Sequence, residues 1–182
     1  MPIWIPTRAD ALARLKDFLP RAGTHYAAGR NFDFGPDNRD NVSGLSPYVR
    51  HRLIREDEIV AEVLARYDRD EGEKFLQEVC WRTYWKGWLE LRPEVWNSYQ
   101  TELTSVLEAL KRDHLLNKRY QDAISGRSKI KCMDIWAGEL MEIGYLHNHA
   151  RMLAAGLGGQ ERGQAQALNG QRYGLHMAVG AG

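Results

Sequence analysis

The chain has 182 residues and a formal net charge of +1, with 27% charged and 43% hydrophobic residues. This length suits one domain with a sizeable core, and the near-neutral balance means that any charge used for binding must be local. No apolar run is long enough to span a membrane and no signal-peptide pattern opens the chain, which predicts a soluble cytoplasmic protein without a membrane partner. The two cysteines, Cys80 and Cys132, lie far apart in the sequence; reduced thiols are expected, and a disulfide remains the alternative.

The first helix is predicted to begin after Thr7, a residue type that caps helix N-termini, with Asp10 three positions on. Apolar residues follow at helical spacing until Pro20, which marks the end of the helix. Residues 21–41 are rich in glycine and charge and are predicted to form a long loop, a kind of segment that is often functional in compact domains.

Residues 41–49 place small hydroxyl side chains and Gly44 directly before a helix opened by Pro47. Ser46 is the predicted N-cap of that helix. Free backbone N–H groups at a helix start attract anions, and glycine lets the backbone approach a phosphate closely. Two interpretations follow: an anion site, or an ordinary capped turn.

The rest of the chain to Met152 shows one helical pattern after another and no strand-like alternation, which predicts an all-α helical bundle. Gly144 is a suitable C-terminal cap for one of these helices. The predicted helical segments are residues 56–66, 71–91, 93–110, 115–124, 133–143 and 145–152. From residue 153 to 182 glycine, alanine and glutamine dominate, and this tail is predicted to be poorly ordered.

Residues 78–88 combine three tryptophans with a carboxylate and two cations on a single predicted helix. Positions three and four apart share a helix face, so Glu78, Trp81, Arg82 and Trp85 form one stripe. The tryptophans could be plain core. Glu78 and Arg82 are harder to place in a core because a buried charge needs a partner or a ligand. A flat, aromatic, partly anionic ligand would suit both the tryptophans and the charged residues.

Other chemistries find little support in the sequence. His147 and His149 are two positions apart, so they do not share a helix face, and structural roles are favoured over metal binding. No glycine-rich nucleotide motif and no glycine-flanked serine elbow is present, so nucleophilic hydrolysis has no support.

Three segments in order, residues 41–48, 78–82 and 144–152, resemble motifs of the photolyase and cryptochrome family. The resemblance covers Arg8 to Met152 and lies within the first part of that family's helical FAD-binding domain. It implies a short relative without the α/β antenna domain. Domain organisation is therefore expected to be a partial FAD-binding helical domain over residues 1–152, followed by the tail over residues 153–182.

The resemblance implies a bound FAD and light-driven electron transfer to a pyrimidine lesion flipped out of duplex DNA. Carried over motif by motif, it assigns cofactor binding to Tyr26, Ser43, Gly44, Leu45, Ser46, Phe75, Arg82 and Arg151. The loop serines and Tyr26 would hold the pyrophosphate, and Phe75 and Arg82 would lie along the flavin.

The same carry-over assigns the DNA side of the site. Glu78 and Trp81 would face the lesion, the first by hydrogen bonding to a base edge and the second by stacking. Asn148 would sit between flavin and substrate and share catalysis with those two residues. His149 and Met152 would lie near the DNA.

The chain departs from the family pattern in several places. Val42 replaces a threonine before the loop serine, Thr83 replaces an acidic residue, and His149 stands where repair enzymes often carry arginine. After Met152 the family's later helices are not recognisable, which implies a truncated or frame-shifted relative. Three functions therefore stay open: FAD-dependent DNA repair, a cryptochrome-like flavin photoreceptor without repair, and an inactive truncated remnant.

Overall fold

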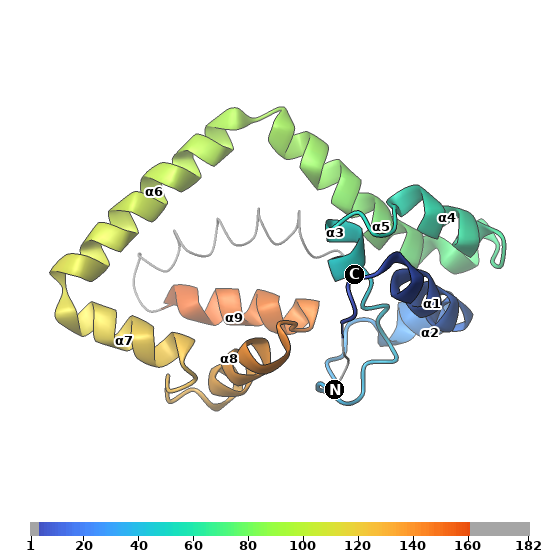
Figure 1. The fold of residues 1–182 in the computed structure, drawn as a ribbon. Helices are drawn as coiled ribbons and strands as arrows, with labels where there is room; N and C mark the ends of the chain where they lie inside the picture. The colour runs from blue at the N-terminus through green and yellow to red at the C-terminus, as the bar shows by residue number, and fades with distance from the viewer. Residues whose placement is uncertain (1–3, 161–182) are drawn as a thin grey trace. The chain divides into compact units, whose positions relative to one another are not determined.

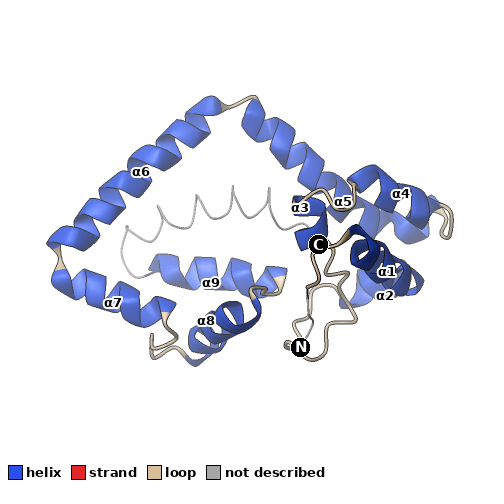
Figure 2. Ribbon diagram, viewed as in Figure 1, coloured by secondary structure: helices blue, strands red, loops and turns tan. Residues whose placement is uncertain are grey.

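The computed structural model describes residues 4–160, and every regular element in that range is a helix (Figures 1 and 2). The prediction of an all-α chain is confirmed. The described residues divide into two compact units, residues 4–88 and residues 89–160. Each unit is considered by itself below.

The first unit contains six helical segments, which account for its core. They are α1 (Arg8–Phe18), the 3-10 turn η1 (Leu19–Arg21), α2 (Thr24–Gly29), α3 (Ser46–Arg50), α4 (Glu56–Leu64) and most of α5 (Arg69–Glu90). Their buried apolar side chains form one continuous cluster that includes Leu15, Phe18, Ile59 and Phe75. Because Ile59 of α4 and Phe75 of α5 both belong to this cluster, it determines which sides of these two helices face each other.

The start of α1 follows the predicted chemistry. The Thr7 side-chain oxygen accepts a hydrogen bond from the Asp10 backbone N–H at 3.1 Å, which satisfies one of the free donors at the helix start. Pro20 lies in η1, directly after the end of α1, as the sequence predicted.

The segment between α1 and α3 differs from the prediction of one long loop because α2 occupies Thr24–Gly29. The remaining loop is held in place by Asn41, whose side-chain amide donates to the carbonyl oxygens of Gly29 and Phe32 at 2.8 Å each. These two bonds close the loop at the point where the chain enters the turn before α3.

The second unit contains α6 (Pro93–Arg112), α7 (His114–Ile124), α8 (Lys131–Ile143) and α9 (Asn148–Gln160). Gly144 ends α8 in a left-handed conformation with φ 67°, which confirms it as the predicted cap. No side chain of α6 or α7 is buried, and large apolar side chains of this unit, among them Trp96, Leu115 and Met141, are about half exposed or more.

The last described helix runs beyond the residues whose pattern predicted it. α9 continues to Gln160, so the helix that the sequence predicted to reach Met152 extends into the segment expected to be poorly ordered. The expectation for residues 161–182 lies outside the described residues. Among the described helices, none combines the length and the apolar character that crossing a membrane requires.

Candidate functional site

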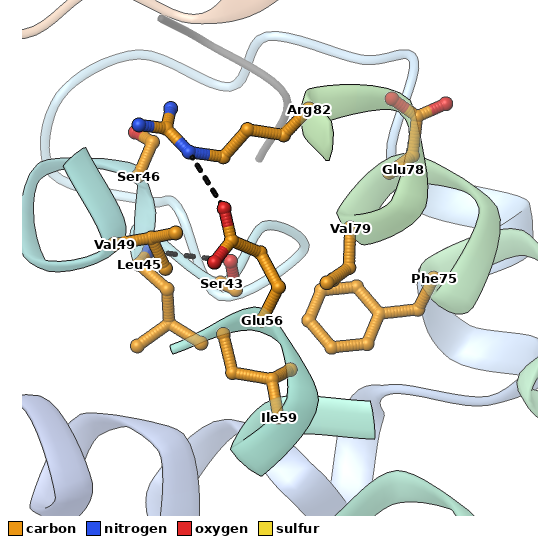
Figure 3. A pocket seen from close by; sticks show the side chains of 10 residues that line it. All are labelled: Ser43, Leu45, Ser46, Val49, Glu56, Ile59, Phe75, Glu78, Val79 and Arg82. Carbon is orange, nitrogen blue, oxygen red and sulfur yellow. Dashed lines mark hydrogen bonds and ion pairs between the residues drawn. The ribbon is translucent and has the colours of Figure 1, made fainter. Parts of the chain in front are cut away.

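A pocket in the first unit is lined by residues from two of the motifs found in the sequence (Figure 3). The turn before α3 and α3 itself contribute one side, α4 contributes the base, and α5 contributes the other side. The lining residues are Ser43, Leu45, Ser46, Val49, Glu56, Ile59, Phe75, Glu78, Val79 and Arg82. The enclosed space of the pocket is small, about 10 Å³, roughly the room for one water molecule, and the pocket opens to solvent.

The turn over residues 43–46 is fully buried and depends on Gly44. Gly44 has φ 60°, and a Cβ atom there would lie 2.6 Å from Arg14 Nη1 and 3.1 Å from the Trp4 ring. Glycine adopts this backbone without strain, whereas any side chain here would be strained and would have to push Arg14 and Trp4 aside. The side of Gly44 on which a side chain would project is therefore already occupied by the protein's own side chains.

The cap of α3 is one residue earlier than predicted. Leu45 is the N-cap and makes no side-chain cap bond, so Ser46 is the first residue of the helix rather than its cap. Ser43 supplies the local order instead, because its hydroxyl oxygen accepts the Leu45 backbone N–H at 3.2 Å. The Ser46 hydroxyl group belongs to the pocket lining.

Tyr26 and Phe75 belong to an aromatic cluster in the core. Their rings meet at a centroid distance of 5.0 Å, and Phe75 also meets Phe18 at 5.1 Å. Phe75 is 1% exposed and contributes to the pocket lining from within this cluster. Edge-to-face and tilted contacts of this kind hold the rings in fixed positions.

Glu78 forms an ion pair with Arg30, the arginine at the end of α2, and the two side chains are about three-quarters buried. Burial alone would lower the pKa of Arg30, but its hydrogen bond and charge interaction with Glu78 raise it above the ordinary value. The guanidinium also lies over the Tyr26 ring, 5.9 Å from its centroid. Arg30 thus supplies the positive charge that the largely buried carboxylate of Glu78 needs.

Arg82 is 4% exposed and points into the pocket, where its Nε lies 3.2 Å from Glu56 Oε1 (Figure 3). Burial lowers the pKa of Arg82 although Glu56 opposes this effect. Burial likewise tends to raise the pKa of Glu56, but its own backbone N–H and Lys86 outweigh it and lower the pKa overall. Glu56 is therefore ionised at neutral pH, and an arginine keeps its proton under the same conditions.

Sequence reasoning missed Glu56 as a pocket residue. The sequence did give one signal, since a charge on the buried face of a helix requires a counter-charge. It could not identify which carboxylate supplies that charge, because Glu56 and Arg82 meet only through the packing of α4 against α5.

Trp81 is not plain core. Its side chain is 46% exposed, and Tyr84 beside it is 55% exposed. Trp81 is stacked with Trp85 at 6.2 Å and 25° and meets the edge of Tyr84 at 5.3 Å. Trp88 continues the series, 5.6 Å from Trp85. α5 therefore presents a row of contacting aromatic rings with Trp81 and Tyr84 open to solvent.

The third motif lies in the second unit. The Asn148 side-chain amide donates weakly to Met152 Sδ at 3.7 Å, and the Arg151 backbone N–H donates to the His147 carbonyl oxygen at 3.0 Å. His147 is buried, and its Nδ1 accepts the His149 backbone N–H at 3.2 Å, which is a structural role at the start of α9. No group of metal-ligating side chains gathers within residues 4–160.

The structure thus brings together the first and second motifs, from Ser43 to Arg82, around one pocket. Asn148, His149, Arg151 and Met152 belong to the second unit.

The chain is similar to parts of two curated proteins, both named deoxyribodipyrimidine photo-lyase. It is 24% identical to the one from Vibrio cholerae over 157 residues, which cover 84% of this chain and 32% of that protein. It is 26% identical to the one from Alkalihalophilus pseudofirmus over 162 residues, covering 80% of this chain and 29% of that protein. No protein-family model and no solved structure matches. The chain spans about a third of the length of these relatives, and the similarity supports a relationship to photolyases.

Proposed function

We propose that this chain is a member of the photolyase and cryptochrome family that binds FAD and takes part in light-driven repair of pyrimidine lesions in DNA. One observation carries the proposal. Ser43, Ser46 and Arg82, which come from two separate motifs, line a single pocket together with Phe75. The similarity to two photolyases over about four-fifths of the chain supports the same family.

The lining fits one part of a flavin site. Hydroxyl groups of Ser43 and Ser46 and the guanidinium of Arg82 are donors suited to phosphate oxygens. Leu45, Val49 and other apolar side chains give a wall on which a flat ring can rest. Tyr26 supports this wall from the core behind Phe75.

When bound, reduced FAD would supply the light-excited electron that breaks the lesion, and the protein would supply position and surroundings. The loop serines would hold the pyrophosphate, and Arg82 would hold an electron-rich edge of the cofactor. Gly44 would contribute by fixing the turn that carries both serines. Arg151 of the third motif would complete the cofactor contacts.

On the DNA side, the exposed ring of Trp81 would stack on a flipped-out base, as aromatic side chains do on unpaired bases. Glu78 would accept a hydrogen bond from a base edge and would have to share its carboxylate with Arg30. Asn148 would lie between flavin and lesion, and His149 and Met152 would approach the DNA.

Absorbance of the purified protein tests cofactor binding directly. A flavoprotein is yellow with a band near ~450 nm, a property of the cofactor. Arg82→Ala should lower flavin content, whereas Arg69→Ala, which removes an exposed arginine at the start of the same helix, should leave it unchanged. Colourless protein that takes up no added FAD would refute the proposal for this chain.

Repair is separated from photoreception by a second assay. Light-dependent loss of thymine dimers from a damaged oligonucleotide supports repair. Flavin binding and light response without that loss favours the cryptochrome-like alternative, since one fold serves both functions.

A second candidate is an inactive remnant that holds no flavin. The observation that favours it is the exposure of large apolar side chains on α6, α7 and α8, such as Trp96, Leu115 and Met141, because surfaces of this kind normally face a partner. Strong binding of a hydrophobic dye together with absence of flavin would favour this candidate over the flavoprotein.

A further inference from the structure

Glu56 is the centre of a cationic cluster formed by Arg52, Arg82 and Lys86. Its Oε1 lies 3.2 Å from Arg82 Nε and 3.2 Å from Lys86 Nζ, and its Oε2 lies 3.1 Å from Arg52 Nη1. One carboxylate therefore faces three cations. This arrangement is larger than a structural ion pair needs, because Arg52 and Lys86 alone supply two cations to one carboxylate.

The other carboxylates near this cluster in the described part of the first unit have cations of their own. Asp57 pairs with Arg55, Glu58 pairs with Arg8, and Glu78 pairs with Arg30. Arg50 adds positive charge near this cluster: burial is the main cause that lowers the pKa of Arg82, and the charges of Arg50 and Arg52 lower it further.

The cluster reaches from the interior to the surface. The side chain of Arg82 is buried at the pocket, that of Lys86 is partly exposed, and that of Arg52 is 62% exposed. Arg52 also has a φ of 59°, a backbone conformation that side-chain-bearing residues adopt only at a cost. Because the side chains of Arg52 and Lys86 are not buried, an anion from solvent can approach them directly.

The carboxylate of Glu56 shows the kind of group that this cluster holds: a compact anion with oxygen acceptors. A phosphate group has the same acceptors and more negative charge, and arginine and lysine side chains are its usual protein partners. A phosphate would compete with Glu56 for the same donors and, once Glu56 swings away, would balance more of the surplus charge.

We propose that Arg52, Arg82 and Lys86 form a phosphate-binding subsite, and that Glu56 is an internal counter-ion that occupies it until a phosphate-bearing ligand displaces it. The subsite shares Arg82 with the flavin pocket but does not require that flavin binds. The phosphate could belong to a dinucleotide or to a nucleic-acid backbone.

Titration of the purified full chain with inorganic pyrophosphate at low ionic strength, followed by calorimetry, tests this inference. Glu56→Gln removes the competing charge and should tighten pyrophosphate binding on the order of tenfold. The double variant Arg52→Ala/Lys86→Ala should weaken it by about the same factor or more. Arg55→Ala removes an equal charge nearby, from an exposed arginine that pairs with Asp57, and should change little.

The inference is overturned if Glu56→Gln binds pyrophosphate no more tightly than the unchanged chain, or if the double variant binds it equally well. Should Glu56→Gln fail to fold, the double variant alone decides, because Arg52 and Lys86 are not buried.

Parallel titrations with FAD and with an undamaged single-stranded oligonucleotide identify the source of the phosphate. Tightening by Glu56→Gln for only one of them assigns the subsite to that ligand. Pyrophosphate binding that follows the expected order in a protein that takes up no FAD would uphold the subsite while refuting the proposed flavin function.

Discussion

Replacing Phe75 by alanine should destabilise the first unit far more than replacing Trp81 on the same helix. Phe75 is 1% exposed and contacts the rings of Phe18 and Tyr26 at 5.1 and 5.0 Å. Truncating a buried phenylalanine removes its transfer free energy and leaves a cavity, which together cost about 3–5 kcal/mol. Because the truncation also removes the favourable pairing of Phe75 with two other rings, the upper half of that range is expected.

Trp81→Ala is the matched control, an aromatic-to-alanine change six positions along α5. Trp81 is 46% exposed and contacts only the rings of Tyr84 and Trp85 in the aromatic row. Loss of such ring pairs costs about 0.5–1.5 kcal/mol each before solvent exposure reduces it. A loss of about 1 kcal/mol is therefore expected, and the two variants should differ by about 3 kcal/mol.

Urea unfolding followed by far-ultraviolet circular dichroism measures both free energies without relying on tryptophan emission. Amide hydrogen exchange then locates the destabilised region, which for Phe75→Ala should comprise α1, α2 and α5. A loss below 1 kcal/mol for Phe75→Ala would refute the core assignment and would leave Phe75 as a ring held at the pocket for a ligand.

Three further predictions follow from single contacts. Trp81→Ala should weaken binding of a damaged oligonucleotide by about 1–3 kcal/mol if its ring stacks on a base; unchanged affinity in a fluorescence anisotropy titration would contradict that role. Gly144→Ala should cost about 1 kcal/mol in thermal unfolding, because alanine disfavours the φ of 67° at the end of α8; an unchanged midpoint would contradict it. The Arg8 guanidinium and the Arg55 backbone N–H lower the pKa of Glu58 from 4.5 to about 2. The stability from this group is therefore full above about pH 4.5 and lost as pH falls toward 2, and Glu58→Gln should flatten that part of the stability–pH curve.

The helices could be predicted because each carries its own local pattern. Thr7 and Gly144 are end signals that depend only on neighbouring backbone groups, and the structure uses both as expected. α2 was missed because its six residues, the last of which is Gly29, contain no complete apolar period. The extension of α9 past Met152 was missed because glycine lowers helix propensity without forbidding a helix.

The pocket was predictable only in part. The turn over residues 43–46 and the stripe around Arg82 were identifiable from residue types at fixed spacing. The burial of Phe75 and the exposure of Trp81 were not, because both are aromatic residues on one helix and only the packing of α1 and α2 distinguishes their faces. The pairing of Arg82 with Glu56 is also a tertiary event, between residues separated by 26 positions.

At Arg52, the residue type that would be best for stability differs from the one that supplies positive charge. Glycine would relax a φ of 59° and would be the natural choice in a screen for thermal tolerance. The same change would delete the outermost positive group next to Glu56. A glycine variant at this position should therefore be more stable to heat and bind polyanions more weakly. The arginine keeps the positive charge at the cost of a less favourable backbone conformation.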